Sequence, residues 1–318
     1  MAKDVVYVLD PYHQEALKKL GDIPNVDYIY RDDPKSANWR DEATAIMIRS
    51  ETRVTAADLE QVKKLKVIVK QGVGVDNIDL EAAKQRGIAV CNTPALNSES
   101  VAELTITMAL CIARRVAELD RRVRGGEAII RSTALGMSLY KKTIGIIGMG
   151  NIGKVVAQKW NAAMEGQVVG YDPFAPDDAW PNIKHRRVRS LEELLVEADV
   201  VTLHVPLSSG TRNMIGKRQF ELMKPNAILV NAARGDTVDE TALLEALTTK
   251  KLYGAALDAM NVEPPTAEAY HQLLQNENVI MTPHVGANTV ENQIISGTAV
   301  VDTVLAGLDG QNVPNRLV

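Results

Sequence analysis

The chain has 318 residues, which is too long for one ordinary hydrophobic core and predicts two compact domains. Hydrophobic residues make up 46% of the chain and charged residues 24%, as in soluble globular proteins. A net charge of -4 gives no electrostatic reason to bind nucleic acid or an anionic membrane. The sequence has no apolar run long enough to cross a membrane and no signal-peptide pattern, so we expect a cytoplasmic protein.

Two smaller features of the composition bear on ligands. Cys91 and Cys111 both lie in apolar stretches and are predicted to be buried, so neither a disulfide nor a metal site is expected. The only basic cluster spans residues 114–124, where Glu118 and Asp120 interrupt the arginines. We interpret it as the solvated or oligomer-facing side of a helix rather than a site for a polyanion.

Short apolar runs alternate with amphipathic stretches of helix length, which is typical of a parallel sheet covered by helices. In the first part, the expected strands are Val5–Leu9, Ala45–Ile48, Val67–Val69 and Ile88–Val90, and the expected helices are about Pro11–Leu20, Ala56–Lys63 and Leu80–Arg86. The turn-rich residues 92–98 can form a hinge. A long apolar helix, capped by Ser98 or Ser100, is then expected to run to about Arg122.

A second series of alternating segments begins at Thr143. Its expected strands are Thr143–Ile147, Val168–Tyr171, Val200–His204, Ala227–Asn231, Gly254–Leu257 and Val279–Met281. A final helix over about Glu291–Ala306 is predicted to return to the first domain. We therefore predict an α/β protein with two doubly wound domains, one built from residues 1–97 and 290–318 and the other from residues 98–289.

The clearest local motif is a glycine-rich loop between a strand and a helix. Gly148, Gly150 and Gly153 follow the apolar run 144–147 and open the next helix. The first glycine permits a tight turn, the second lets the backbone approach a pyrophosphate, and the third lets the helix pack against the strand. The helix N-terminus then offers free N–H groups to the diphosphate, so the loop predicts a dinucleotide site.

Asp172 ends the next strand, nineteen residues after Gly153. A carboxylate there can bind both hydroxyls of the adenosine ribose and would repel a 2′-phosphate, so NAD is favoured over NADP. The alternative is a tight turn between a strand and a helix with an incidental acidic residue.

A second glycine-containing loop, residues 72–77, also follows a strand. It carries Asn77 where the third glycine should stand, and no matching acid ends the next strand. We assign it to the substrate side, where its backbone N–H groups could hold a carboxylate.

Three charged or titratable residues follow predicted strands: Arg234, Glu263 and His284. In an open parallel sheet, ligands bind beyond the carboxyl ends of the strands. A guanidinium can bind the carboxylate and ketone oxygens of a 2-keto acid, an imidazole can act as acid or base, and an adjacent carboxylate sets its tautomer. Each residue alone could equally form a structural ion pair or a satisfied polar contact, so the spacing leaves both the catalytic and the structural interpretation open.

Together these segments resemble the D-isomer-specific 2-hydroxyacid dehydrogenases over essentially the whole chain, and most closely their phosphoglycerate dehydrogenase branch. The matching segments are residues 74–79, 92–94, 101–104, 148–153, 204–207, 223–225, 231–235, 263–265 and 283–287. The resemblance implies a Rossmann NAD-binding domain inserted into a flavodoxin-like substrate-binding domain. It also implies hydride transfer between NAD and C2 of a small anionic 2-hydroxy or 2-keto acid, in a homodimer with the helix after Asn97 in its interface.

The resemblance also implies roles for individual residues. Arg234 would orient and polarise the substrate, Glu263 would support the histidine, and His284 would be the acid/base. The residues implied to bind the cofactor are Gly148, Gly150, Asn151, Ile152, Gly153, Asp172, His204, Val205, Pro206, Ala232, Ala233, Arg234, Asp258 (on the nicotinamide amide), His284 and Gly286. Those expected to bind the substrate are Arg49, Ser50, Lys70, Gln71, Gly72, Val73, Gly74, Arg234 and His284.

The chain departs from the family pattern at two places. Ala259-Met260 stands where the family usually has Val-Phe, and Ala128 takes the place of a tryptophan often found after the long helix. The first concerns the packing beneath Glu263 and the second the dimer arm, so neither removes a catalytic group. Because the chain stops at Val318, we expect no C-terminal regulatory domain and no serine feedback through one.

The sequence leaves the substrate open. Arg49-Ser50 and Lys70 fall in loops where the phosphoglycerate branch carries cationic groups, which favours phosphohydroxypyruvate and 3-phosphoglycerate, and Arg131 of a partner subunit could join them. If these are ordinary surface charges, glyoxylate, hydroxypyruvate or another 2-keto acid is expected. An alternative of another class is an NAD-sensing binding protein similar to the transcriptional co-repressors that share this fold.

Overall fold

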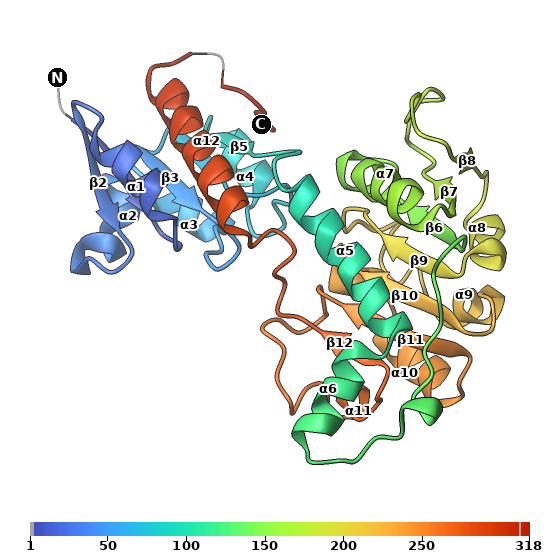
Figure 1. The fold of residues 1–318 in the computed structure, drawn as a ribbon. Helices are drawn as coiled ribbons and strands as arrows, with labels where there is room; N and C mark the ends of the chain where they lie inside the picture. The colour runs from blue at the N-terminus through green and yellow to red at the C-terminus, as the bar shows by residue number, and fades with distance from the viewer. Residues whose placement is uncertain (1–2, 312) are drawn as a thin grey trace. The chain divides into compact units, whose positions relative to one another are not determined.

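The computed structural model describes residues 3–311 and 313–318. Its contacts separate two compact units, both drawn in Figure 1. Unit 1 runs up to Asn97 and resumes at Ala287, and unit 2 is the intervening segment Ser98–Gly286. Within the described residues, no helix combines the length and the apolar character needed to span a membrane.

The sheet of unit 1 has five parallel strands in the order β2-β1-β3-β4-β5. They are β1 (Asp4–Val8), β2 (Val26–Tyr30), β3 (Ala45–Ile48), β4 (Val67–Lys70) and β5 (Ala89–Asn92). Every residue of β3 and β4 is buried, as expected for strands of a parallel sheet that is covered on both faces. The strand order is that of flavodoxin-like folds, which confirms this part of the predicted fold.

Helices cover both faces of this sheet. α1 (Gln14–Gly21) and α12 (Val290–Leu308) pack on one face, and Figure 1 shows α12 lying across the strands. The other face is covered by α2 (Trp39–Glu42), which follows η1 (Pro34–Asn38), and by α3 (Ala56–Gln61) and α4 (Leu80–Gln85).

The sheet of unit 2 has seven parallel strands in the order β12-β11-β10-β9-β6-β7-β8. They are β6 (Thr143–Ile147), β7 (Gln167–Tyr171), β8 (Arg186–Arg187), β9 (Val200–Leu203), β10 (Ala227–Asn231), β11 (Leu252–Leu257) and β12 (Val279–Met281). This is the Rossmann order with a seventh strand beside the sixth, so the predicted Rossmann fold is confirmed.

Two layers of helices enclose this second sheet. α5 (Ser98–Ala113) and α7 (Asn151–Met164) pack on one face, and α8 (Leu191–Glu197), α9 (Lys217–Leu222) and α10 (Glu240–Thr248) pack on the other. The other helices described in this unit are α6 (Val116–Arg124), α11 (His271–Leu274), η2 (Arg131–Thr133) and η3 (Gly235–Thr237). Because all seven strands run parallel, the loops that follow them gather at one edge of the sheet.

The long helix predicted after Asn97 is in fact two helices. α5 ends at Ala113 and α6 begins at Val116, because Arg115 adopts a left-handed conformation with φ of 55°. The prediction that Ser98 or Ser100 caps this helix is also wrong, because both residues lie inside its first turn. The apolar pattern continues across the break, so it could not reveal it.

Other differences concern the edges of the two sheets. The sequence pattern does not predict β2, an edge strand with no fully buried residue, or β8, which has only two residues. Cys91 is buried as predicted, whereas Cys111 is only partly buried.

Candidate active site

The glycine-rich loop joins β6 to α7. Gly148 has φ of 99°, and a Cβ atom there would lie 2.4 Å from the carbonyl oxygen of His204. A Cβ atom on Gly153 would lie 2.2 Å from the carbonyl oxygen of Gly148. By contrast, the Cβ position of Gly150 is open, and this residue begins α7 without a capping side chain. The fold itself therefore requires the first and third glycines, whereas the second leaves space at the helix N-terminus.

Gly150→Ala is expected to leave the fold intact and to weaken NADH binding by about tenfold or more, because the new methyl group would enter the space expected for the pyrophosphate. NADH titration and thermal melting would measure the two effects. Gly153→Ala is the contrasting variant, and we expect it to melt at a markedly lower temperature. Unchanged NADH affinity in Gly150→Ala would contradict the cofactor assignment of this loop.

Asp172 directly follows β7, and its carboxylate holds two loops. Oδ2 accepts a hydrogen bond from the N–H of Met149 at 2.9 Å, within the glycine-rich loop. Oδ1 accepts from the N–H groups of Phe174 and Ala175 at 2.9 and 3.2 Å. Arg187 fixes the same turn by donating to the carbonyl oxygens of Asp172 and Ala175. Asp172 thus lies beside the glycine-rich loop, where a ribose-binding acid belongs, and also organises that region.

Arg234 lies in a loop after β10 that Asn231 holds in place. The fully buried Asn231 donates from Nδ2 to the carbonyl oxygen of Arg234 at 2.8 Å and accepts from the N–H of Ala233 at 3.1 Å. The hydroxyl of Thr237 donates to the same carbonyl of Arg234 at 2.6 Å. Sequence reasoning did not identify Asn231 or Thr237, although a buried asparagine at the end of a strand is a signal for such a role.

His284 and Glu263 form a hydrogen-bonded pair. Nδ1 of His284 lies 2.9 Å from Oε2 of Glu263, and the other carboxylate oxygen accepts from the N–H of Met260 at 3.0 Å. His284 has φ of 55°, a left-handed conformation that residues other than glycine rarely adopt. Because Nδ1 faces Glu263, Nε2 is the ring nitrogen left to exchange a proton with a substrate.

The carboxylate of Glu263 is held in its charged form. Partial burial alone would raise its pKa, but the hydrogen bond and the charge of His284, the N–H of Met260 and the charge of Arg234 together bring the pKa below its usual value. Gly235, the residue after Arg234, lies directly against the backbone of Met260 and Asn261, so the loops that carry Arg234 and Glu263 are in contact. The structure therefore brings Arg234, Glu263 and His284 together in unit 2.

Asp258 fixes the loop that carries His284. Its carboxylate is buried and accepts hydrogen bonds from the hydroxyl of Thr282 at 2.6 Å and from the N–H groups of Val285 and Gly286, both at 2.8 Å. These contacts lie on both sides of His284, so they restrain its strained backbone. The resemblance assigned Asp258 to the nicotinamide, and sequence reasoning gave no sign of this second role.

A comparable support holds the loop before Glu263. The N–H of Asn261 donates to Glu240 at 2.8 Å, and the N–H of Val262 donates to the hydroxyl of Tyr270 at 2.8 Å. Burial raises the pKa of Glu240. Neither Glu240 nor Tyr270 carries a sequence signal, because each acts through a contact with a residue distant along the chain.

His204 lies after β9, at the same edge of the sheet. Its Nε2 lies 3.0 Å from the hydroxyl of Thr202, and its Nδ1 is buried without a hydrogen-bond partner among the described residues. Burial lowers the pKa of His204 to about 3. The other residues expected around the cofactor also follow strands of this sheet: Val205 and Pro206 after β9, and Ala232 and Ala233 after β10.

The lowered pKa of this partly buried imidazole predicts a loss of stability in acid. His204 stays neutral in the folded chain but is protonated in the unfolded chain below about pH 6.5, so its contribution is present above that pH and is lost as pH falls toward 3. Between about pH 7 and pH 5 we expect a loss of at least about 1 kcal/mol. Urea unfolding of the wild type and of His204→Asn at both pH values measures it. The same pH dependence in both proteins would contradict this assignment.

Apart from Arg234 and His284, the residues expected to bind the substrate lie in unit 1. Arg49 and Ser50 follow β3, and Lys70 at the end of β4 is buried and donates from Nζ to the carbonyl oxygen of Gly74 at 2.5 Å. The N–H of Gly72 donates to the hydroxyl of Thr93 at 2.7 Å and so is already engaged. Among the described residues, the N–H groups of Val73 and Gly74 have no partner and are the donors left for a carboxylate.

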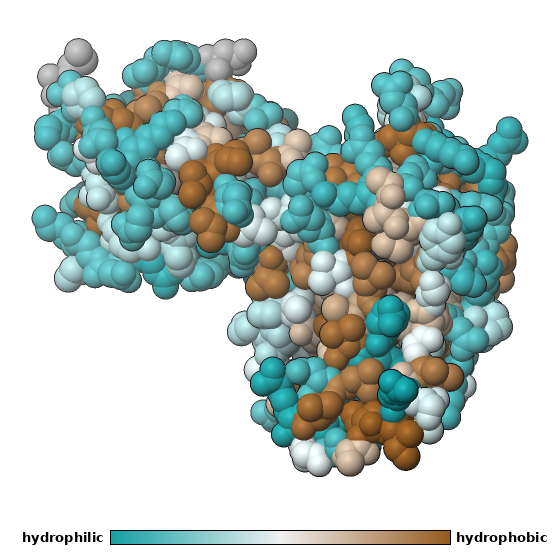
Figure 2. Space-filling view, in the orientation of Figure 1, coloured by the Kyte–Doolittle hydropathy of each residue, from teal (hydrophilic) through white to brown (hydrophobic). Residues whose placement is uncertain are grey.

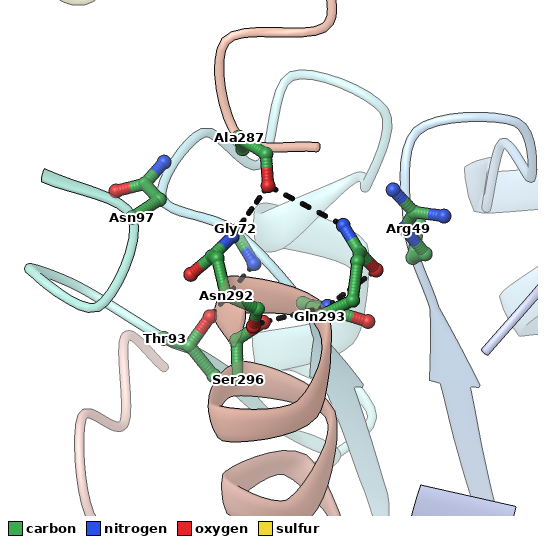
Figure 3. Close-up of a pocket in the computed structure, with 9 residues that line it drawn as sticks. Arg49, Gly72, Thr93, Asn97, Ala287, Asn292, Gln293 and Ser296 are labelled. Carbon is green, nitrogen blue, oxygen red and sulfur yellow. Dashed lines mark hydrogen bonds between the residues drawn. The ribbon is translucent and has the colours of Figure 1, made fainter. Parts of the chain in front are cut away.

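Arg49, Gln71 and Gly72 line a pocket within unit 1 (Figure 3). Its other lining residues are Thr93, Asn97, Ala287, Asn292, Gln293 and Ser296. Figure 3 shows Arg49 on one side of this pocket and Asn97 on the other. The guanidinium of Arg49 donates to Asn288 Oδ1 at 2.8 Å and to the carbonyl oxygen of Pro11 at 3.3 Å.

Comparison with known proteins finds relatives over nearly the whole chain. The family model for the NAD binding domain of D-isomer specific 2-hydroxyacid dehydrogenases matches residues 106–286. A D-3-phosphoglycerate dehydrogenase of Methanocaldococcus jannaschii is 41% identical over 317 residues, covering 98% of this chain and 60% of that protein. A hydroxypyruvate reductase of Thermotoga maritima is 38% identical over 310 residues, covering 97% of this chain and 99% of that protein.

A solved structure extends the comparison to three dimensions. The crystal structure of D-lactate dehydrogenase from Aquifex aeolicus, complexed with NAD and lactic acid, matches with a TM-score of 0.85 and 31% identity over 99% of each chain. This chain spans about three fifths of the length of the Methanocaldococcus enzyme. The chain belongs to the D-isomer specific 2-hydroxyacid dehydrogenase family, and residues 106–286 form the NAD-binding domain of that family.

Proposed function

We propose that this chain catalyses the NAD-dependent interconversion of a D-2-hydroxy acid and the corresponding 2-keto acid. In the reductive direction, the 2-keto acid, NADH and a proton give the 2-hydroxy acid and NAD. The observation that carries the proposal is the hydrogen-bonded pair of His284 and Glu263, which shares its electrostatic environment with Arg234. A proton donor, its carboxylate partner and a guanidinium are the groups that this reaction needs.

Each of the three residues has a distinct proposed role. Arg234 binds the carboxylate and the keto oxygen of the substrate, which orients C2 and polarises the carbonyl. His284 delivers a proton from Nε2 to the keto oxygen as hydride arrives, and in the reverse direction Nε2 removes the hydroxyl proton. Glu263 holds Nδ1–H, which fixes the tautomer and stabilises the imidazolium. Bound NADH supplies the hydride.

The residues of unit 2 fit NAD. The Cβ position of Gly150 is open, the N-terminus of the 14-residue α7 has no capping side chain, and Asp172 ends β7 beside this loop. We propose that Asn151 and Ile152 bind the diphosphate and that Asp172 binds the ribose hydroxyls. The nicotinamide end would then be bordered by His204, Val205, Pro206, Ala232, Ala233, Asp258 and Gly286.

Unit 1 is the proposed substrate-binding domain. The N–H groups of Val73 and Gly74 would bind the substrate carboxylate. Arg49 and the similarity to D-3-phosphoglycerate dehydrogenase support a phosphorylated acid such as 3-phosphohydroxypyruvate. The similarity to a hydroxypyruvate reductase, which extends over nearly the whole of both chains, supports an unphosphorylated acid instead. A cytoplasmic location belongs to the same proposal, since both cysteines carry free thiols.

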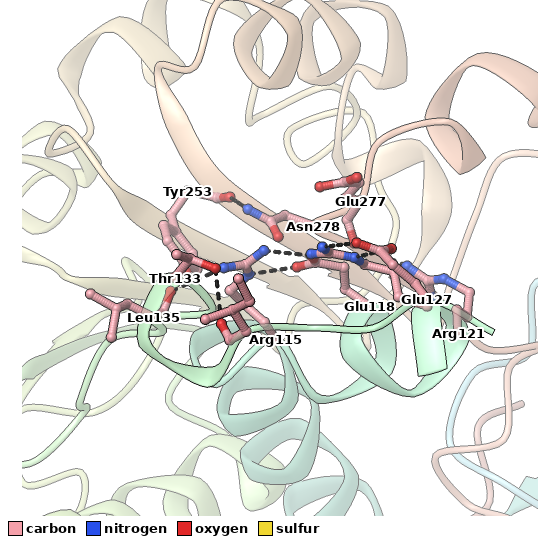
Figure 4. Close-up of polar contacts among 11 residues, drawn as sticks. Arg115, Glu118, Arg121, Glu127, Thr133, Leu135, Tyr253, Glu277 and Asn278 are labelled. Atoms are coloured by element: carbon pink, nitrogen blue, oxygen red, sulfur yellow. Dashed lines mark hydrogen bonds and ion pairs between the residues drawn. The ribbon is translucent and has the colours of Figure 1, made fainter. Parts of the chain in front are cut away.

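The segment after α5 supports a homodimer. This segment carries five exposed hydrophobic residues: Val116, Val123, Ile130, Leu135 and Tyr140. Figure 2 shows hydrophobic surface over this part of unit 2. Figure 4 shows Arg115 beside the buried Glu118 in this segment, and Arg122 forms a second ion pair with Glu118 at 2.9 Å. Arg115 also donates to the carbonyl oxygen of Leu135. Arg115 and Arg122 of the basic cluster thus anchor the segment that presents the apolar surface, whereas Arg114, Arg121 and Arg124 are exposed, as expected for a solvated helix face.

Changing both Ile130 and Leu135 to aspartate is expected to convert a dimer into a monomer, since each side chain is about 70% exposed in the single chain and charge would oppose its burial. Light scattering of the purified protein measures the mass. Phe174→Asp is the matched control, because Phe174 is equally apolar and 93% exposed but lies in the turn after β7. A wild-type monomer, or a dimer that survives both changes, would contradict this assembly.

The proposed activity is tested by following NADH oxidation with a panel of 2-keto acids that includes phosphohydroxypyruvate, hydroxypyruvate, glyoxylate and bulkier acids. Saturable turnover with at least one of them is the expected result. If NADH binds but no acid is reduced, the NAD-sensing alternative takes the place of this proposal. If NADH does not bind, the cofactor assignment fails as well.

A further inference from the structure

The pocket of unit 1 contains polar atoms that lack partners. Three amide oxygens are buried there without a hydrogen-bond partner in the part of the chain that the structure describes: Oε1 of Gln71, Oδ1 of Asn97 and Oδ1 of Asn292. Gln71 and Asn292 are only 6% and 5% exposed. A buried polar atom without a partner is costly, and in native proteins nearly all such atoms are satisfied. Three of them in one pocket therefore indicate that something with hydrogen-bond donors fills it.

The neighbouring contacts determine which end of each amide is unpaired. Asn292 donates from Nδ2 to the carbonyl oxygen of Ala287 at 2.6 Å, and a carbonyl can only accept. Ser296 donates its hydroxyl proton to the carbonyl oxygen of Asn292, so its oxygen accepts from Nε2 of Gln71 at 2.6 Å. Asn292 is thus oriented by a backbone carbonyl (Figure 3), and Gln71 by the hydroxyl of Ser296 and by Oε1 of Gln293. The amide atoms that lack a partner are therefore oxygens rather than nitrogens.

The pocket therefore offers acceptors and one cation. Arg49 stands opposite Asn97, with its guanidinium already donating to Asn288 and Pro11. A phosphate dianion presents only oxygen atoms and would be repelled by the three unpaired amide oxygens. A hydroxyl group presents a proton that an amide oxygen can accept, while the acid's negative charge still matches Arg49.

We propose that this pocket selects a 2-keto acid that carries a free hydroxyl group, with Gln71 and Asn292 as the residues that accept its hydrogen bond. The inference rests on the proposed function and narrows its substrate class to an unphosphorylated hydroxylated acid, of which hydroxypyruvate is the smallest example. An analogue with a methyl group in the same place leaves the buried oxygens unpaired, and discrimination against it follows from that cost.

The first test compares kcat/KM of the wild-type protein for hydroxypyruvate, pyruvate and 3-phosphohydroxypyruvate. Pyruvate differs from hydroxypyruvate by one hydroxyl oxygen, so their ratio isolates the hydroxyl group. We expect hydroxypyruvate to exceed pyruvate by at least about tenfold, and to exceed the phosphorylated acid as well. Equal values for hydroxypyruvate and pyruvate, or a preference for the phosphorylated acid, would overturn the proposal.

The second test assigns the effect to residues. Gln71→Met and Asn292→Leu replace the amide group by an apolar end of similar length and shape, so each should lower the hydroxypyruvate-to-pyruvate ratio by about tenfold. Gln85→Met is the control, since Gln85 is an exposed glutamine of α4 in the same unit, and it should keep the wild-type ratio. Thermal melting identifies a variant that fails to fold. A wild-type ratio in both folded pocket variants would overturn the assignment.

A binding measurement separates this inference from the proposed function. Calorimetric titration of D-glycerate and D-lactate requires no turnover, and these acids again differ by one hydroxyl group. If no 2-keto acid is reduced but D-glycerate still binds more tightly than D-lactate, and Gln71→Met removes the difference, the pocket assignment stands and the proposed activity fails. If turnover occurs without any preference for the hydroxyl group, the activity stands and the pocket assignment fails.

Discussion

Replacing His284 with alanine is expected to lower kcat for 2-keto acid reduction roughly 10²–10⁴-fold, because it removes the imidazole that we propose as the proton donor. Affinity for NADH should change little, since Asp258 still holds the backbone of Val285 and Gly286 through its carboxylate. Steady-state NADH oxidation gives kcat, and NADH titration gives the affinity. A large loss of kcat with little change in NADH affinity is the result that identifies an acid/base residue.

His271→Ala is the matched control for this experiment. His271 is an exposed histidine of α11 in the same unit, and its loss should leave kcat unchanged. Glu263→Gln provides an intermediate case, because it keeps the size of the side chain but removes the charge that stabilises the imidazolium. If His284→Ala retained kcat within about tenfold of the wild type, the proton donor would have to be another group.

Gly235→Ala is expected to lower both stability and kcat/KM more than any other single methyl addition in the active site. A Cβ atom on Gly235 would lie 1.9 Å from the carbonyl carbon and 2.2 Å from the carbonyl oxygen of Met260. Backbone atoms cannot move aside as a flexible side chain can, so the loops carrying Arg234 and Glu263 would have to separate. We expect a loss of about 1–3 kcal/mol in stability and of roughly 10²-fold in kcat/KM.

Gly210→Ala serves as the control for Gly235→Ala. The nearest atom to a Cβ on Gly210, a side-chain oxygen of Ser208, lies 3.9 Å away, and Gly210 does not have a positive φ. Thermal melting and steady-state kinetics apply to both variants. A Gly235→Ala protein with wild-type kinetics would show that the close approach of these two loops is not required for catalysis.

The parts of the site that depend on local backbone requirements could be predicted from the sequence. Gly148 and Gly153 are needed because a Cβ atom at either position would collide with a backbone carbonyl. Since only glycine lacks a Cβ atom, the residue type alone indicates this requirement. The position of Asp172 after a strand could be predicted because the apolar run that forms β7 ends just before it. The positions of Arg234 and His284 followed in the same way from the ends of β10 and β12.

The supporting contacts could not be predicted, because they join residues far apart in the sequence. Nothing local shows that Asp258 accepts from both sides of His284, or that Thr93 occupies the N–H of Gly72. The break between α5 and α6 depends on the left-handed conformation of Arg115 and on its ion pair with Glu118, and an apolar sequence pattern contains neither.

The measurement that tests the central claim most directly is the fate of the hydride. NADH deuterated at the reactive ring carbon would be incubated with the protein and the best 2-keto acid, and the product examined by mass spectrometry and chiral chromatography. The account predicts one deuterium at C2 of the D-isomer for each NADH consumed. An L-isomer product, or a product without deuterium at C2, would contradict it.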